Sequence, residues 1–174
     1  AQKNKEVYPQ DLNKKHELKI NVFNLVALSS VNASYERLIN KDASFGFDVF
    51  YNTNNNFDDG LRKYSLTSYY RWFFSEKFAT RGFFVEGFGM LNTQEAREYN
   101  SFTDDQGNIT SNSTIKERTD FALGIAVGGK FVTKKNFVAE VFIGLGRNLF
   151  NIKPDDFFDT SLVSRGGISL GYRF

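Results

Sequence analysis

The C-terminal segment of the sequence alternates in residue type from Leu162 to the last residue, Phe174. Ile168, Leu170, Tyr172 and Phe174 share one parity, and small or basic residues occupy the other. Successive side chains of a β-strand point to opposite faces, so this segment predicts a strand with one apolar face and one polar face. Membrane-barrel strands separate lipid from lumen in this way, whereas the last residues of a soluble domain usually fray.

The same alternation predicts seven further strands, around residues 17–27, 31–36, 44–51, 66–72, 82–92, 120–131 and 140–146. Short connections at 40–42, 75–81 and 132–136 alternate with longer ones at 52–63, 93–118 and 148–161. The predicted fold is an all-β, eight-stranded antiparallel up-and-down transmembrane β-barrel over residues 17–174, after a periplasmic tail over residues 1–16. A soluble lipid-binding barrel with its apolar face inside is the alternative.

Composition supports strands that cross a membrane. Aromatic residues make up 17% of the chain, but only 41% is hydrophobic and the mean hydropathy is −0.40, which suits a wall of rings around a polar interior. No segment has the ~18 consecutive apolar residues of a membrane helix. The balance of 22 basic and 20 acidic residues argues against a nucleic-acid partner.

The polar parity of the predicted strands forms a candidate lumen charge network. An eight-stranded barrel is only wide enough for its own side chains to fill, so these charges must pair. Five are basic and five acidic: Lys19, Arg71, Lys130, Arg165 and Arg173 against Glu36, Asp48, Glu86, Asp120 and Glu140. We expect a plugged lumen, with a narrow pore as the alternative.

The turns predict neighbouring-strand partners within this set. Folding the chain about residues 75–81 sets Arg71 opposite Glu86, and folding it about 132–136 sets Lys130 opposite Glu140. The glycines on the polar parity are expected to make room for the long charged side chains; they are Gly46, Gly124, Gly128, Gly144, Gly146 and Gly171.

Catalytic and ligand motifs are weak. Residues 124–131 match a phosphate-binding loop except for Phe131 in place of Ser or Thr, and they alternate as a strand instead of forming the required turn. The one histidine, His16, falls in the predicted tail. Asp104, Asp105 and Asn108 surround Gly107 without the rest of a calcium loop. We expect no enzyme activity, no cofactor and no metal.

One small-residue patch interrupts the apolar face. The turn at 75–81 sets Ser68 opposite Gly89 and Tyr70 opposite Gly87. Glycine in a strand often marks close approach by another backbone. We therefore predict a docking groove for a partner protein here, with a lipid-filled groove as the alternative.

Residues 17–174 resemble small eight-stranded bacterial outer-membrane proteins of the OmpA, OmpX and OmpW type. Several segments are similar to an uncharacterised family of Bacteroidota, hence Gram-negative, outer-membrane barrels; they are Lys19-Ile20-Asn21, Tyr35-Glu36-Arg37, Tyr69-Tyr70-Arg71, residues 82–87 and the closing Gly171-Tyr172-Arg173-Phe174. The resemblance implies an assembly signal at Gly171, Tyr172 and Phe174 that the barrel-assembly machinery recognises. It carries no known activity.

The resemblance and the strand parity together predict an outer-membrane location with both termini in the periplasm. The expected partners are outer-membrane lipids, lipopolysaccharide, the assembly machinery during insertion and other outer-membrane proteins. The expected function is that of a non-enzymatic structural or accessory subunit of a larger outer-membrane assembly. The alternatives are a narrow transport channel and surface adhesion through the outer loops.

Overall fold

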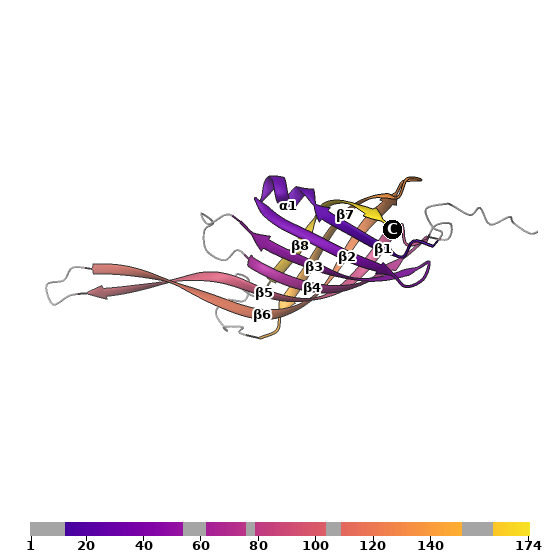
Figure 1. The fold of residues 1–174 in the computed structure, drawn as a ribbon. Helices are drawn as coiled ribbons and strands as arrows, with labels where there is room; N and C mark the ends of the chain where they lie inside the picture. The colour runs from indigo at the N-terminus through magenta and orange to yellow at the C-terminus, as the bar shows by residue number, and fades with distance from the viewer. Residues whose placement is uncertain (1–12, 54–61, 76–78, 104–108, 151–161) are drawn as a thin grey trace, which may run out of the picture.

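Eight antiparallel strands close into a barrel in the computed structural model, which describes residues 13–53, 62–75, 79–103, 109–150 and 162–174 (Figure 1). The strands are β1 (His16–Asn21), β2 (Ser30–Leu38), β3 (Ala43–Asn52), β4 (Arg62–Phe73), β5 (Gly82–Thr103), β6 (Ile109–Val132), β7 (Phe137–Asn148) and β8 (Leu162–Arg173), with a short helix α1 (Val22–Ala27) after β1. Each strand pairs with the next, and β8 pairs with β1 from Glu17↔Arg173 to Asn21↔Ser169. This closure confirms the predicted eight-stranded up-and-down barrel.

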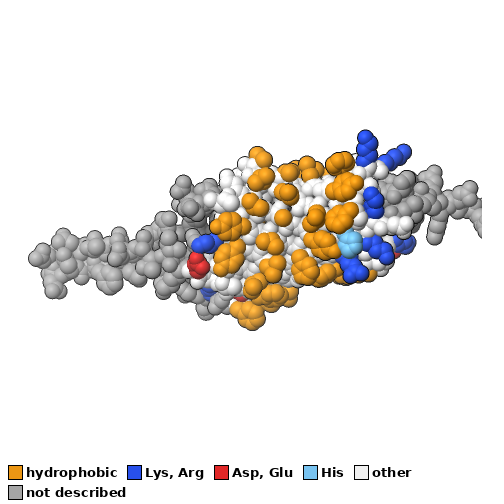
Figure 2. All heavy atoms as spheres, viewed as in Figure 1, with side chains coloured by type: hydrophobic (Ala, Val, Ile, Leu, Met, Phe, Trp, Pro, Cys, Tyr) orange, Lys and Arg blue, Asp and Glu red, His pale blue; other side chains and the backbone are white. Residues whose placement is uncertain are grey.

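The apolar parity faces outward on the barrel wall. Leu66 on β4 is 51% exposed, Ile125 on β6 is 68% exposed and Leu170 on β8 is 51% exposed. Hydrophobic side chains gather in a band over the middle of the visible face in Figure 2. The apolar face is therefore outside, opposite to its place in a soluble lipid-binding barrel.

The two ends of the barrel differ. The turn end holds the β2–β3, β4–β5 and β6–β7 connections and Phe174, and the loop end holds α1 and the far end of β5 and β6 (Figure 1). Basic side chains gather at the turn end in Figure 2. Exposed Lys41, Lys134 and Lys135 belong to its connections.

The prediction that the first strand runs to Ala27 is wrong. β1 ends at Asn21, whose side chain accepts a hydrogen bond from the Asn24 N–H at 3.1 Å and so caps α1. The same side chain donates to the Gly166 carbonyl at 3.0 Å. Gly167 accommodates it with a φ of 134°, and a Cβ there would lie 2.5 Å from Asn21 Oδ1.

The prediction of a loop over residues 93–118 is also wrong for most of that range. β5 continues to Thr103 and β6 begins at Ile109, and their register is continuous from Gly82↔Lys130 to Thr103↔Ile109. This hairpin extends beyond the rest of the barrel (Figure 1). A strand pair that covers no core needs no apolar face, so low hydrophobicity is a poor guide here. The Asp104–Asn108 tip lies outside the described residues.

Candidate functional site

Ten buried charged side chains, drawn from all eight strands, form one ion-pair network across the lumen. Five are basic and five acidic: Lys19, Arg71, Lys130, Arg165 and Arg173, with Glu17, Glu36, Asp48, Glu86 and Glu140. Each stands at an inward position of its strand, so the pleat of the sheet delivers it to the lumen.

The centre of the network is Glu36 on β2. Its carboxylate accepts hydrogen bonds from Lys130 Nζ at 2.5 Å and Arg71 Nη1 at 2.8 Å, and it also accepts from Lys19 Nζ. Glu140 on β7 accepts from Lys19 Nζ and from Arg71 Nη1, each at 2.8 Å. Three cations therefore share two carboxylates at the middle of the lumen.

The network continues toward both ends of the barrel. Toward the turn end, Glu17 accepts from Lys130 Nζ at 2.8 Å and from Arg173 Nε at 2.8 Å. Toward the loop end, Glu86 accepts from Arg71 Nε at 2.7 Å and from Arg165 Nη1 at 2.6 Å. Asp48 lies 3.8 Å from Arg165 Nη2. The charges thus form a continuous chain of contacts instead of isolated pairs.

The register of the strands reproduces the two pairings that the turns predict. Arg71 stands opposite Glu86, and Lys130 stands opposite Glu140. Lys130 Nζ nevertheless reaches Glu36 at 2.5 Å and approaches Glu140 only to 4.0 Å. Contacts across the lumen therefore dominate over contacts between neighbouring strands for this lysine.

One member of the predicted set, Asp120, needs correction. Asp120 is buried, but its carboxylate accepts the backbone N–H groups of Phe121 at 2.7 Å and Phe150 at 3.0 Å, and no described ion pair includes it. It fastens the end of β7 to β6 instead of joining the network. Glu17, which the sequence analysis omits, is the fifth carboxylate of the network instead. Its place two residues before Lys19 puts it on the same face of the strand, and this spacing was the signal that could have identified it.

Aromatic rings fill the lumen space between the charges. The Arg71 guanidinium lies over Phe84 at 4.3 Å and over Tyr69 at 4.6 Å, and that of Arg165 lies over Phe142 at 5.2 Å. Cations over ring faces are attracted by the ring quadrupole. The lumen is thus packed with alternating charge and ring.

The inward glycines make room chiefly for these rings, which corrects the expectation that they accommodate charged chains. A Cβ on Gly46 would meet the Tyr69 ring, one on Gly128 would lie 2.7 Å from Phe84, and one on Gly146 would lie 3.0 Å from Phe88. Gly171 fits the original expectation, since Lys19 Cγ lies 2.5 Å from its Cβ position.

The predicted partner groove has the expected register, with Ser68 opposite Gly89 and Tyr70 opposite Gly87. Side chains of the same chain cover part of it. The Phe121 ring lies 3.1 Å from the Cβ position of Gly89, and the Trp72 ring lies 3.9 Å from that of Gly87. The recess is therefore shallower than the glycines alone predict.

The C-terminal residues complete the seam between β8 and β1. Gly171 stands opposite Lys19, and the Tyr172 ring meets Phe137 edge to face at 5.7 Å between centroids. Phe174 and His16 exchange backbone hydrogen bonds of 2.8 and 3.0 Å. His16 is thus the first residue of β1 and not part of a free tail, and its Nδ1 lies 2.6 Å from the Tyr35 hydroxyl.

The segment that resembles a phosphate-binding loop is an ordinary part of a strand. Residues 124–131 lie within β6 and pair on both sides, with β5 and with β7. Among the described residues, no group of three or more His, Asp or Glu side chains is arranged to hold a metal ion. In that same part of the chain, no helix is long and apolar enough to cross a membrane.

Comparison with solved structures supports the fold. The N-terminal β-barrel domain of Pseudomonas aeruginosa OprF, known from a crystal structure, is similar with a TM-score of 0.57 at 12% identity, over 93% of this chain and 100% of that chain. This likeness shows a shared barrel fold alone. No curated protein matches the sequence. Residues 5–161 match the family described as "Protein of unknown function (DUF3575)", and the chain therefore belongs to this family.

Proposed function

We propose that this protein is an integral outer-membrane β-barrel with a closed lumen, and that it serves as a non-enzymatic structural or accessory subunit of a larger outer-membrane assembly. The observation that carries the proposal is the ion-pair network, which crosses the lumen inside a wall whose apolar residues face outward. This arrangement favours lipid around the wall and a lumen that ions and solutes do not cross.

The wall supports a membrane location. β4, β7 and β8 each have 12 residues. A tilted strand needs ~9–11 residues to cross a membrane, so these strands are long enough. Outward Ile143 is 69% exposed and Phe131 is 68% exposed. Apolar area left in water costs roughly 25 cal/mol per Å², so a band of such residues is stable when lipid covers it.

The orientation that we propose places the turn end in the periplasm. Short periplasmic turns and longer outer loops are the pattern of bacterial outer-membrane barrels. In this orientation Phe174 closes β8 on the periplasmic side, and Gly171, Tyr172 and Phe174 are available to the assembly machinery during insertion. The extended hairpin of β5 and β6 then projects outward, where it can contact another outer-membrane protein.

Conductance distinguishes this proposal from a narrow transport channel. We expect the unaltered protein to give no steady open channel in planar lipid bilayers, because the lumen charges are locked to one another. Arg71→Ala removes contacts to Glu36, Glu86 and Glu140 and should produce brief openings. Lys63→Ala, which changes an exposed ion pair with Glu117, is the matched control and should remain silent. A reproducible open channel in the unaltered protein would contradict the closed lumen.

Copurification tests the accessory role separately. Extraction from native membranes in a gentle detergent is expected to recover the barrel with another outer-membrane protein at a fixed ratio. Adhesion through the outer hairpin predicts instead that the barrel binds a surface outside the cell. Recovery of the barrel alone from every mild extraction would contradict the accessory role and leave the membrane location intact.

A further inference from the structure

The barrel wall is incomplete between β8 and β2 at the loop end. β1 stops at Asn21, and its pairing with β8 ends at Asn21↔Ser169. In the described residues, the part of β8 from Leu162 to Ile168 therefore pairs with β7 on one side and with no strand on the other. α1 occupies this place in the fold (Figure 1).

Side chains donate hydrogen bonds to two backbone carbonyls on this edge of β8. The Gly166 carbonyl accepts from Asn21 Nδ2 at 3.0 Å, and the Ser164 carbonyl accepts from Arg62 Nη1 at 3.4 Å. An unpaired strand edge normally invites another strand. Here two polar side chains donate to it, so these two carbonyls are satisfied without a paired strand.

A cavity of about 620 Å³ lies at this gap. Its lining includes inward residues Phe142 and Arg165 and outward residues Ile143 and Ile168. Because neighbouring residues of one strand point to opposite faces, a cavity lined by both parities connects the mouth of the lumen with the outer surface. The volume falls within the ~300–1,000 Å³ of typical small-molecule sites.

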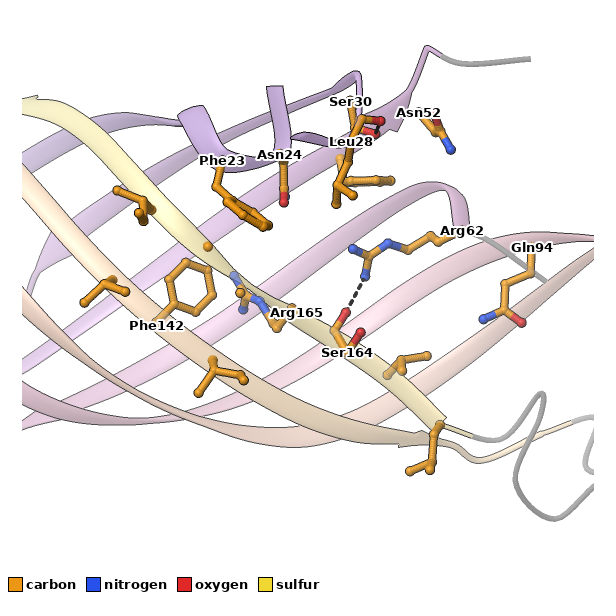
Figure 3. A pocket seen from close by; sticks show the side chains of 18 residues that line it. Phe23, Asn24, Leu28, Ser30, Asn52, Arg62, Gln94, Phe142, Ser164 and Arg165 are labelled. Carbon is orange, nitrogen blue, oxygen red and sulfur yellow. Dashed lines mark hydrogen bonds between the residues drawn. The ribbon is translucent and has the colours of Figure 1, made fainter. Parts of the chain in front are cut away.

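The cavity has apolar sides and, among the described residues, a cation that makes no ion pair, Arg62. Figure 3 shows Phe23 and Asn24 pointing from α1 toward β8, and Arg62 reaching across to Ser164. The Arg62 guanidinium lies 4.3 Å from the centroid of the Phe50 ring. Its Nε is buried without a hydrogen-bond partner, and no ion pair among the described residues includes it.

Within the described residues, no ion pair of the lumen network includes Arg62. Its five cations are matched by its five carboxylates. Asp48, the member nearest the loop end, is held by Asn32 Nδ2 at 2.8 Å and lies 3.8 Å from Arg165. Asp48 is the carboxylate among the described residues whose charge acts on Arg62, and it is already engaged by Arg165 and Asn32. The half-buried Arg62 guanidinium can therefore pair with an anion that enters the cavity.

We propose that this cavity binds a single-chain anionic amphiphile, a long-chain fatty acid, with its carboxylate on Arg62 and its chain between Phe23, Phe142 and Ile168. The inference rests on the proposed membrane location, because the chain enters through the side of the wall that faces lipid. A guanidinium and a carboxylate form a strong, charge-assisted hydrogen bond. The apolar sides exclude water around it, and the volume accommodates one chain.

Native mass spectrometry of the full chain, released from a non-ionic detergent, tests the site with palmitate as the probe. We expect one palmitate per barrel. Arg62→Gln should weaken palmitate binding at least tenfold, and Arg62→Lys should restore most of it because the charge returns. Lys63→Gln is the matched control: it removes the next cation along β4, which pairs with Glu117 at 2.7 Å, and should leave binding unchanged.

Two further probes separate the fatty acid from other occupants. Methyl palmitate has the same chain without the carboxylate and should bind at least tenfold more weakly than palmitate. Any of three results would overturn the proposal: equal affinity for palmitate and methyl palmitate, palmitate binding by Arg62→Gln equal to that of the unaltered protein, or displacement of palmitate by a two-chain phospholipid. These outcomes leave the membrane location untouched, since lipid contact of Trp72, at the turn end of β4 and outside the cavity lining, is measured independently of the cavity.

Discussion

Replacing Glu36 with alanine is expected to destabilise the folded barrel by about 3–5 kcal/mol, as for other buried ion pairs that lose one partner. Glu36 is 0% exposed and contacts Lys19, Arg71 and Lys130. Its removal leaves buried positive charge with too few carboxylates, and the packed lumen admits little water to compensate. Urea-induced unfolding from lipid vesicles measures the free energy of unfolding.

The exposed ion pair between Lys63 and Glu117 is the control for this measurement. Its side chains are 35% and 51% exposed at 2.7 Å, so Glu117→Ala should cost less than about 1 kcal/mol. Glu36→Gln keeps the shape of the side chain and removes the charge, and should resemble Glu36→Ala more than the control. Equal losses for Glu36→Ala and Glu117→Ala would contradict a stabilising role of the network.

Gly171→Ala is expected to have the second large effect, because it places a Cβ in the seam that closes the barrel. That atom would collide with the backbone carbonyl oxygen of Leu18 and lie 2.8 Å from Lys19 Cα. Backbone atoms of a paired strand cannot rotate away as a side chain can. Overpacking of this kind costs about 1–3 kcal/mol, and more where nothing can shift, so we expect a loss near the upper end.

Refolding from urea into detergent measures this loss without the assembly machinery, and so separates the seam geometry from the proposed assembly signal. The folded fraction is read as the faster band on an unheated gel in dodecyl sulfate. Gly129→Ala is the matched control, since the nearest atom to its Cβ position is 3.9 Å away on Phe131. Normal refolding of Gly171→Ala would show that the seam tolerates a side chain.

Much of the barrel could be predicted because period-2 alternation reports directly which face of a strand is apolar. β6 and β8 keep a strict parity, so their inward residues Lys130, Arg165 and Arg173 follow from the sequence. The pairing of Arg71 with Glu86 also follows, since a hairpin fixes which residues stand opposite each other.

Contacts across the lumen could not be predicted in the same way. Glu36 meets Arg71 from β4 and Lys130 from β6, and such partners depend on how the closed barrel brings distant strands together. Sequence spacing carries no information on this. The same holds for the rings of Phe84 and Phe142, whose parity is readable but whose stacking on Arg71 and Arg165 is not.

Local departures from regular strand geometry explain the other failures. The sequence pattern assigns Arg62 to the 52–63 connection, but β4 begins at this residue. The register shifts between Arg62 and Tyr64, and the guanidinium reaches the inward Met90 Sδ at 3.0 Å. α1 depends on an asparagine cap and on Gly167 across the seam, neither of which apolar alternation detects. These two departures are also what create the cavity beside β8.

The central claim is that lipid surrounds the apolar wall while the charges stay inside. The chain has one tryptophan, Trp72, which lies on the wall and is 50% exposed, so its fluorescence reports on the wall without any substitution. In vesicles of phospholipid brominated along the acyl chain, we expect strong quenching of Trp72 and little quenching by iodide in the water. Strong quenching by iodide with no effect of the brominated lipid would contradict the account.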